Sequence, residues 1–370
     1  MLLDPLDARW LAMLTASPPA DLNGWSLEDW QRCVRVARRL RLLARVAHAV
    51  KRQGAWPMVP AGPARQLQAE HELSAWRSDK LRWALDRVGG ALQGAGCPRV
   101  LLKGAAYMAQ GLWIAAGRLP SDADILVPQG ALARCQALLG EAGWREPELD
   151  AHDQRYYREW SHEVPPMHHD LHPVELDLHH NILPPVGRHR VDAGLLFARL
   201  EPSGWPGWQV LHPQDQLLHS VCHLAYDAEP RERLRDIVDA DGLMREFGRT
   251  RADFWPGLVA RARELGLTEP LWLVVTLARR WMRTPVPEPV LVELSAVAPS
   301  AWRRAWLLPL WQRLLAPVDP DRRGDWRQDL AAFVALVRYH RNRMPLRLLV
   351  PHLLHKARRP PADAPVKALE

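Results

Sequence analysis

Apolar residues recur at intervals of three and four along the first quarter of the chain, and this spacing predicts helices. The stretch WSLEDWQRCVRVARRLRLLARVAHAV, residues 25–50, keeps this period throughout, and Ser26 is placed to cap its first turn. The proline- and glycine-containing segment 56–63 ends this helix. A second helix is expected over 63–95, ending at the glycines at 94 and 96. We therefore expect an N-terminal helical region over residues 1–95.

The pattern changes between residues 96 and 190, where short apolar or alternating runs predict a small sheet. The elements expected there are a strand at 99–102, a Lys-Gly turn and a helix, a strand that carries Asp122 and Asp124, a helix at 130–144, a strand over RYYREW at 155–160, and an alternating strand, PVELDLHHNI, at 173–182.

Helical spacing returns after this region. Amphipathic helices are expected at 212–227, 231–247, 270–283, 300–316 and 326–342. The stretch 191–357 is thus predicted to be a C-terminal helical domain, and the proline-rich, polar stretch 358–370 a disordered tail. The predicted fold class is α+β: a small mixed-sheet core at 96–190, flanked by helical regions on both sides.

Asp122 and Asp124 are the most informative residues of the predicted sheet. Residues two apart on a strand point to the same face, so both carboxylates project together from an apolar element. At a separation of roughly 5 Å and an effective dielectric of ~20, their repulsion is on the order of 3 kcal/mol. A divalent cation that serves phosphoryl or nucleotidyl transfer would relieve it. The alternative is a polar turn that merely begins a strand.

A third carboxylate on the later strand strengthens the metal interpretation. In PVELDLHHN, Glu175, Asp177 and His179 share one face of the predicted strand, and apolar residues occupy the other. Three carboxylates on neighbouring strands can hold two Mg²⁺ ions that clamp the attacking and leaving oxygens of an in-line displacement. An ordinary half-exposed strand would show the same alternation.

These motifs together resemble a known superfamily. The order LLKGAAY, then R-x-x-S-D-A-D-I-L-V, then V-E-L-D-L-H is similar to the nucleotidyltransferases related to DNA polymerase β, and within them to the bacterial group called nucleotidyltransferase family proteins. The later segments LLHSVCHLAYD and RLRDIVDADGLM are similar to a His-rich helix and an Asp-containing helix of that group. The resemblance covers about residues 70–250.

The resemblance implies a site and a reaction. Asp122, Asp124 and Asp177 would be the catalytic and metal-binding carboxylates, with Glu175 as the rival for the third position. Lys103, Gly104 and Arg118 would contact the nucleotide: the glycine through close approach to the phosphates, the two cations by neutralising charge.

The implied reaction transfers a nucleoside monophosphate from an NTP, with ATP expected, to a hydroxyl or phosphate acceptor. It depends on Mg²⁺ or Mn²⁺ and releases pyrophosphate. The acceptor is left open among a protein, a modified peptide, a small molecule and an RNA end.

Two other functions stay open. The superfamily has Gly-Ser at the turn where this chain has Lys103-Gly104-Ala105, which suits a catalytically inactive nucleotide- or protein-binding module. The histidine-rich run at 167–172, expected to be a loop, offers His168 and His172, with Asp170 or Asp177, for a metal phosphohydrolase.

Four further residues lie on the predicted helices that follow the sheet. His219 and His223, at i and i+4, are expected to be core histidines or to support the site. Asp236 and Asp239 are expected at a helix surface or cap, with support of the site as the alternative.

Composition limits the substrates, cellular locations and protein classes that fit the sequence. The net charge of +7 permits a polyanionic substrate but comes mainly from arginines spread along helices. The 18 tryptophans fall mostly in helical stretches and are expected to pack helices rather than stack on bases.

The four cysteines form no CxxC motif, and the chain shows neither a signal-peptide pattern nor a long apolar run, so a cytoplasmic protein without a membrane segment is expected. P-loop, Rossmann and nucleophile-elbow motifs are absent from the sequence, which argues against the ATPases, dehydrogenases and esterases built on them.

Overall fold

The structure is a computed structural model that describes residues 3–15, 22, 24–321 and 325–358. For residues 172–173 and 357–358 it describes the backbone. The predicted tail at 358–370 therefore lies outside the described residues, apart from the backbone of its first residue. The described chain is an α+β fold with one small six-stranded mixed sheet and helices before and after it, as the sequence predicts.

Four helices precede the sheet: α1 (Pro5–Leu14), α2 (Leu27–Arg39), α3 (Leu43–Arg52) and α4 (Ala61–Ala91). The first turn of α2 is capped by Ser26, whose hydroxyl accepts a hydrogen bond from the backbone N–H of Asp29, as predicted. The single helix expected at 25–50 is wrong: the chain turns at Leu40–Leu42, where Arg41 has a φ of +54°. This left-handed residue redirects the chain, so α2 and α3 each pack separately against α4.

The sheet is built from six strands in the order β3-β4-β2-β1-β6-β5. Their bounds are β1 (Val100–Leu101), β2 (Asp122–Leu126), β3 (Met167–His169), β4 (His172–His179), β5 (Leu200–Pro202) and β6 (Gln209–Leu211). The central pair, β2–β1, is antiparallel, the pairs β2–β4 and β1–β6 on either side of it are parallel, and the two outer pairs are antiparallel. Strands β5 and β6 follow residue 190, so the sheet extends beyond the predicted core segment into the region that was expected to be helical.

Four short helices connect the strands: α5 (Lys103–Ala109), α6 (Leu132–Glu141), α7 (Ala151–Glu159) and α8 (Ala193–Phe197). The strand expected over RYYREW at 155–160 is wrong, because most of this segment lies in α7. Asp150 caps that helix by accepting from the N–H of Asp153, and Arg155 pairs with Glu159 one turn later. The loop expected at 167–172 is also wrong, since it forms the hairpin of β3 and β4.

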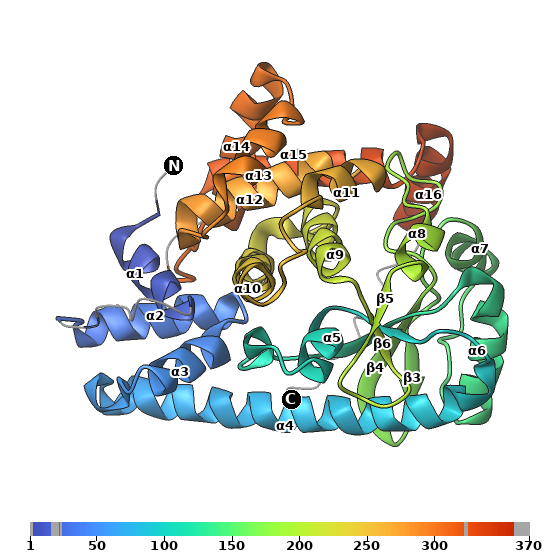
Figure 1. The fold of residues 1–370 in the computed structure, drawn as a ribbon, viewed down its shortest axis with the longest axis horizontal. Coiled ribbons are helices and arrows are strands. Elements are labelled where there is room, and N and C mark those ends of the chain that lie inside the picture. The colour runs from blue at the N-terminus through green and yellow to red at the C-terminus, as the bar shows by residue number, and fades with distance from the viewer. Residues whose placement is uncertain (1–2, 16–21, 23, 322–324, 359–370) are drawn as a thin grey trace.

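In the described residues after the sheet, the α-helices are α9 (Pro213–Ala225), α10 (Leu234–Thr250), α11 (Leu258–Glu264), α12 (Thr268–Met282), α13 (Glu288–Ala296), α14 (Ala301–Leu315), α15 (Trp326–Arg343) and α16 (Leu346–Arg358). In Figure 1, α4 runs along one side of the molecule, the later helices α12–α16 lie on the opposite side, and α9 and α10 lie between them. No helix in the described part of the chain is both long and apolar enough to cross a bilayer.

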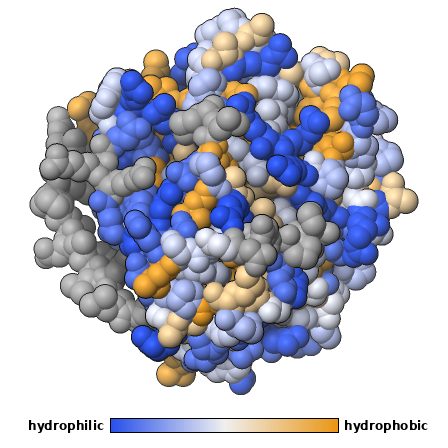
Figure 2. All heavy atoms as spheres, turned by 90° about the vertical axis from the view of Figure 1, so that its left-hand side faces the viewer, coloured by the Kyte–Doolittle hydropathy of each residue, from blue (hydrophilic) through white to orange (hydrophobic). Residues whose placement is uncertain are grey.

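A large hydrophobic core joins most of these parts. It contains side chains of the N-terminal helices, the sheet and helices α9 to α15, and Trp10, Trp30, Trp144 and Trp311 are among its largest fully buried members. A separate small cluster consists of Trp160 at the end of α7, Met344 at the end of α15 and Leu349 of α16. On the face shown in Figure 2, hydrophobic residues are scattered among hydrophilic ones. The helical regions and the sheet are thus packed as a continuous unit, which fixes the elements that surround the site.

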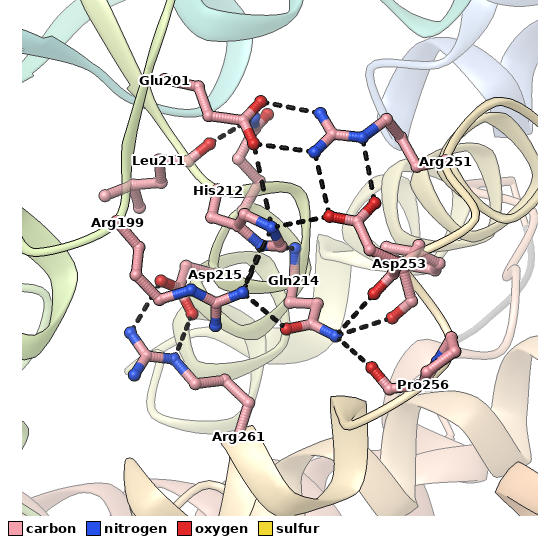
Figure 3. A network of polar contacts seen from close by, with 12 residues as sticks. Arg199, Glu201, Leu211, His212, Gln214, Asp215, Arg251, Asp253, Pro256 and Arg261 are labelled. Carbon is pink, nitrogen blue, oxygen red and sulfur yellow. Dashed lines mark hydrogen bonds and ion pairs between the residues drawn. The ribbon is translucent and has the colours of Figure 1, made fainter.

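A polar network ties the edge of the sheet to the helices beyond it (Figure 3). Arg251, which follows α10, holds both carboxylate oxygens of Glu201 on β5, at 2.7 and 2.8 Å. Arg261 on α11 makes a two-pronged contact with the fully buried Asp215 on α9, at 2.7 and 2.8 Å. Such bidentate pairs fix geometry as well as charge. The first pair joins the segment after α10 to β5, and the second joins α11 to α9.

Candidate active site

Two parallel strands bring the predicted carboxylates together. Asp122 on β2 lies beside Glu175 on β4, and Asp124 lies beside Asp177. Because paired residues, and residues two apart on a strand, share a face, all four carboxylates project from the same side of the sheet. The alternation that the sequence predicts for β4 is present: Leu176 and its apolar neighbours are buried on the other face.

The carboxylates face a cleft of about 450 Å³. Asp122, Asp124 and Asp177 line it, whereas the rival, Glu175, does not belong to its lining. The opposite walls come from α9, α10 and α15, so helices far apart in the sequence surround the two strands.

Asp124 is the most tightly held of the carboxylates. Its side chain is 6% exposed, and its Oδ1 accepts from Lys103 Nζ at 2.7 Å and lies 3.1 Å from His179 Nε2. Lys103 reaches it from the turn after β1, where its own backbone has a φ of +45°. This conformation is uncommon for a residue with a side chain and places the lysine at the start of α5, over the sheet.

The neighbours of each carboxylate set its charge. Burial alone would raise the pKa of Asp124, but Lys103 and His179 outweigh it and hold that pKa well below the usual value. At Asp177 the balance is reversed: burial, followed by the nearby charge of Asp124, outweighs the opposing effect of His179 and raises the pKa to about 8. The site therefore holds more carboxylates than its own cations neutralise, which is the electrostatic setting that a divalent cation fits.

Gly104 and Arg118 lie together beside this turn. A Cβ on Gly104 would lie 3.3 Å from Arg118 Nη1, so the glycine leaves room for the guanidinium over the turn. Arg118 also lies 3.2 Å from a carboxylate oxygen of Asp239 and over the ring of Tyr107. Lys103, Gly104 and Arg118 thus all line the cleft, and both cations are already paired with a carboxylate of the protein.

The expectation that Asp236 and Asp239 lie at a helix surface is wrong, since both are buried and line the cleft from α10. Asp239 pairs with Arg118 and with the buried Arg45 of α3. Asp236 Oδ2 lies 3.3 Å from Nδ1 of His223 on α9. The sequence favours a surface position because a helical period does not reveal what packs against each face.

The histidines divide between the cleft and the surface. His219, buried on α9, and His223 line the cleft. His168 is exposed on the β3–β4 hairpin, and the side chain of His172 lies outside the described residues. Among the described side chains, the groups that could hold a metal ion are Asp124–Asp177–His179 and His162–Glu163–His179, and neither contains His168 or Asp170.

Several cleft residues gave no recognisable signal in the sequence. His162 and Glu163 come from the segment between α7 and β3, and Tyr339, Asn342 and Arg343 come from the end of α15. None belongs to a motif, and only the packing of the helices places them beside the carboxylates.

Comparison with known proteins agrees with this geometry. The sequence model of a family described as uncharacterised nucleotidyltransferases matches residues 26–283. This span is well over half of the 370 residues, and the chain belongs to that family. The resemblance inferred from the turn and the carboxylate strands is thereby confirmed at the level of the family. The searches of curated proteins and of solved structures found no match.

Proposed function

We propose that this protein transfers a nucleoside monophosphate from an NTP to a hydroxyl or phosphate acceptor in a Mg²⁺- or Mn²⁺-dependent reaction. The observation that carries the proposal is the pairing of Asp124 with Asp177 on adjacent parallel strands, with Asp122 on the same face, at the wall of the cleft. Membership of a nucleotidyltransferase family supports the reaction class.

Asp122, Asp124 and Asp177 would hold the cation, whose chemistry is to neutralise the phosphates and to orient the attacking and leaving oxygens. The position of Asp177 in the cleft, compared with that of Glu175 outside its lining, supports Asp177 as the third carboxylate. Oδ1 of Asp124 is already engaged by Lys103 and His179, which orient this side chain toward the site.

The remaining groups serve charge and proton transfer. An oxygen of the acceptor would attack the α-phosphorus of the NTP while the bond from that phosphorus to the bridging oxygen breaks and pyrophosphate leaves. Asp177 would accept the proton of an attacking hydroxyl. Lys103 and Arg118 would stabilise negative charge on the phosphates, and the absence of a side chain at Gly104 lets a phosphate approach the turn. ATP is the nucleotide that we propose, and the acceptor is a protein, a modified peptide, a small molecule or an RNA end.

A nucleotide-binding module without catalysis is the second candidate. The ion pair between Lys103 and Asp124 favours it, because the lysine already neutralises a carboxylate that the reaction would use. Metal dependence separates the two functions: catalysis needs the cation at the carboxylates, whereas a module can bind phosphates through Lys103 and Arg118 alone.

Calorimetry with ATP and each other NTP, with and without Mg²⁺ or Mn²⁺, tests the proposal. We expect metal-dependent binding in the wild type, its loss in the double variant Asp122→Ala/Asp124→Ala, and its retention in Glu175→Gln, the matched control on the same strand face. Pyrophosphate release with candidate acceptors then tests turnover. Equal binding by the wild type and the double variant would contradict the proposal, and metal-independent binding without pyrophosphate release would favour the module.

A further inference from the structure

The two ring nitrogens of His179 face two different acidic groups. Nε2 lies 3.1 Å from Asp124 Oδ1, and Nδ1 lies 3.4 Å from Glu163 Oε2, in a side chain that is 4% exposed. An ionised carboxylate can only accept hydrogen bonds, so Nε2 carries the proton and donates to Asp124. A cation that takes the place of a proton on Nδ1 would therefore lie between this nitrogen and Glu163. Within the described part of the chain, Nδ1 has no hydrogen-bond partner.

His162 completes a group of three around this position. Its Nε2 lies 3.9 Å from the same oxygen of Glu163, and its ring centroid lies 5.5 Å from that of His179. An imidazole nitrogen is a common metal ligand, and metal binding itself displaces any proton on it. One donor atom from each of His162, Glu163 and His179 lies within 4.8 Å of the others.

The backbone holds these three residues in place. Glu163 forms an antiparallel bridge with His179. On either side of this bridge, the N–H of Val164 donates to the carbonyl of Leu178 at 3.0 Å, and the N–H of His180 donates to that of His162 at 2.9 Å. The segment after α7 is thus paired with the end of β4, so the group does not depend on a free loop.

We propose that His162, Glu163 and His179, through its Nδ1, form a second metal site that takes Zn²⁺. Two imidazole nitrogens and one carboxylate oxygen suit Zn²⁺, whereas the all-oxygen group of aspartates beside it suits Mg²⁺. In a tetrahedral zinc site with bonds of about 2.1 Å, ligand atoms lie about 3.4 Å apart. The separations of 3.4 and 3.9 Å at Glu163 need only small side-chain movements to reach that geometry.

Three protein ligands leave the fourth position of Zn²⁺ open. Because His162 and Glu163 both line the cleft, that position faces the space in which a water or a substrate oxygen would lie. The carboxyl group of Glu163 lies close enough to Asp177 and to Arg343 to act on the pKa of each. This inference does not rest on the proposed nucleotidyl transfer, since it concerns metal binding by the protein alone.

Titration of the full, metal-free chain with Co²⁺, and then with Zn²⁺ in competition, tests the site in the absence of nucleotide. We expect one Co²⁺ per chain with the intense visible absorption of a tetrahedral ion, displaced by Zn²⁺. Glu163→Gln and His162→Ala should each weaken binding by more than about 100-fold, beyond the range of an outer-shell change. His168→Gln, at an exposed histidine, should bind as the wild type does.

Asp122→Ala separates this site from the magnesium site, because Asp122 is outside the group of three. It should keep the Co²⁺ absorption even though we expect it to weaken metal-dependent nucleotide binding. Circular dichroism and thermal melting check that each variant folds, and the isosteric Glu163→Gln change is the one expected to disturb the fold least. Absence of saturable binding by the wild type, unchanged binding by Glu163→Gln, or loss of Co²⁺ in Asp122→Ala would each overturn the proposal.

Discussion

At the scale of single residues, the cleft shows how neighbours decide the charge of a carboxylate. Asp124 and Asp177 are paired across two strands, yet the pKa of Asp124 is held low, against the effect of burial, by Lys103 and His179, while burial and Asp124 raise that of Asp177 to about 8. Two like charges at this distance disfavour double ionisation unless a cation joins them. The two aspartates therefore differ in pKa although the sequence presents them alike.

Replacing Asp177 by Asn tests its role as acceptor of a proton. The change preserves shape but removes the base, so we expect turnover, measured as pyrophosphate release, to fall by about 10²- to 10⁴-fold. Glu175→Gln should leave turnover within about twofold, because that side chain lies outside the lining of the cleft. The assignment of Asp177 would be wrong if the two variants exchanged these effects.

Asp253, an exposed carboxylate that pairs with Arg251, allows a test of how stability depends on pH. Hydrogen bonds from Arg251, above all, lower the pKa of Asp253 to about 2. A carboxylate with a pKa lowered by folding stabilises the folded state above its unfolded pKa, and this contribution is lost as pH falls through the folded pKa. We expect Asp253→Asn to lower the free energy of unfolding at pH 6 by less than about 1 kcal/mol, since Asp253 is exposed.

The same variant should lose less stability than the wild type between about pH 4 and pH 2, because it has no carboxylate there to protonate. Urea unfolding at several pH values measures both effects. Parallel stability curves for the two proteins over that range would exclude the role given to Asp253.

At the scale of elements, a buried ion pair joins α3 to α10 behind the cleft. Arg45 and Asp239 are 7% and 4% exposed, and Asp239 is shared with Arg118 from the segment before β2. Burial lowers the pKa of Arg45, and Asp239 partly offsets this by stabilising the charged guanidinium. The pair places α10 against the N-terminal helices and fixes the position of a cation that we propose binds phosphate.

We expect Asp239→Asn to lower the free energy of unfolding by about 3–5 kcal/mol, because it leaves buried guanidinium charge without its partner. Chemical denaturation provides the measurement. Asp329→Asn is the matched control: its ion pair with Arg231 is exposed, and its loss should cost less than about 1 kcal/mol. Similar losses in the two variants would show that burial does not govern the strength of the α3–α10 pair.

At the scale of the whole molecule, helix α15 completes a cleft whose carboxylates lie on β2 and β4, more than 140 residues earlier in the chain. Arg343 of α15 lines it, donates from Nε to the hydroxyl of Tyr156 at 2.8 Å, and lies over the rings of Tyr156 and Tyr339. The family match ends at residue 283, so this wall belongs to a part of the chain beyond the matched region. We propose that this wall contributes to the choice of acceptor.

Arg343→Gln tests whether this wall of the cleft binds a substrate. A charged hydrogen bond is worth about 1.5–3 kcal/mol, so we expect binding of an anionic substrate to weaken by about 10- to 100-fold. Arg341→Gln, at an exposed position on the same helix, should bind as the wild type does. Calorimetry with NTP, and with each acceptor found by pyrophosphate release, identifies which substrate contacts Arg343. Unchanged binding of all these substrates would exclude a role for Arg343 in substrate binding.

Much of the local structure follows from the sequence. The capped start of α2, the long α4, the apolar strand that carries Asp122 and Asp124 and the alternation of β4 are all present, because side-chain period and capping residues act over a few neighbouring residues. The short strands β3, β5 and β6 were missed, since three residues are too few to establish a period.

What the sequence alone determined is the α+β fold class, the family and a set of carboxylates able to share one face of a sheet. Only the tertiary structure decided that Asp124 pairs with Lys103 and His179, that Asp239 is buried between two arginines, and that His162 and Arg343 belong to the same cleft. The reason is physical: periodicity specifies which face of an element is apolar, whereas contacts between distant elements depend on how those faces pack together.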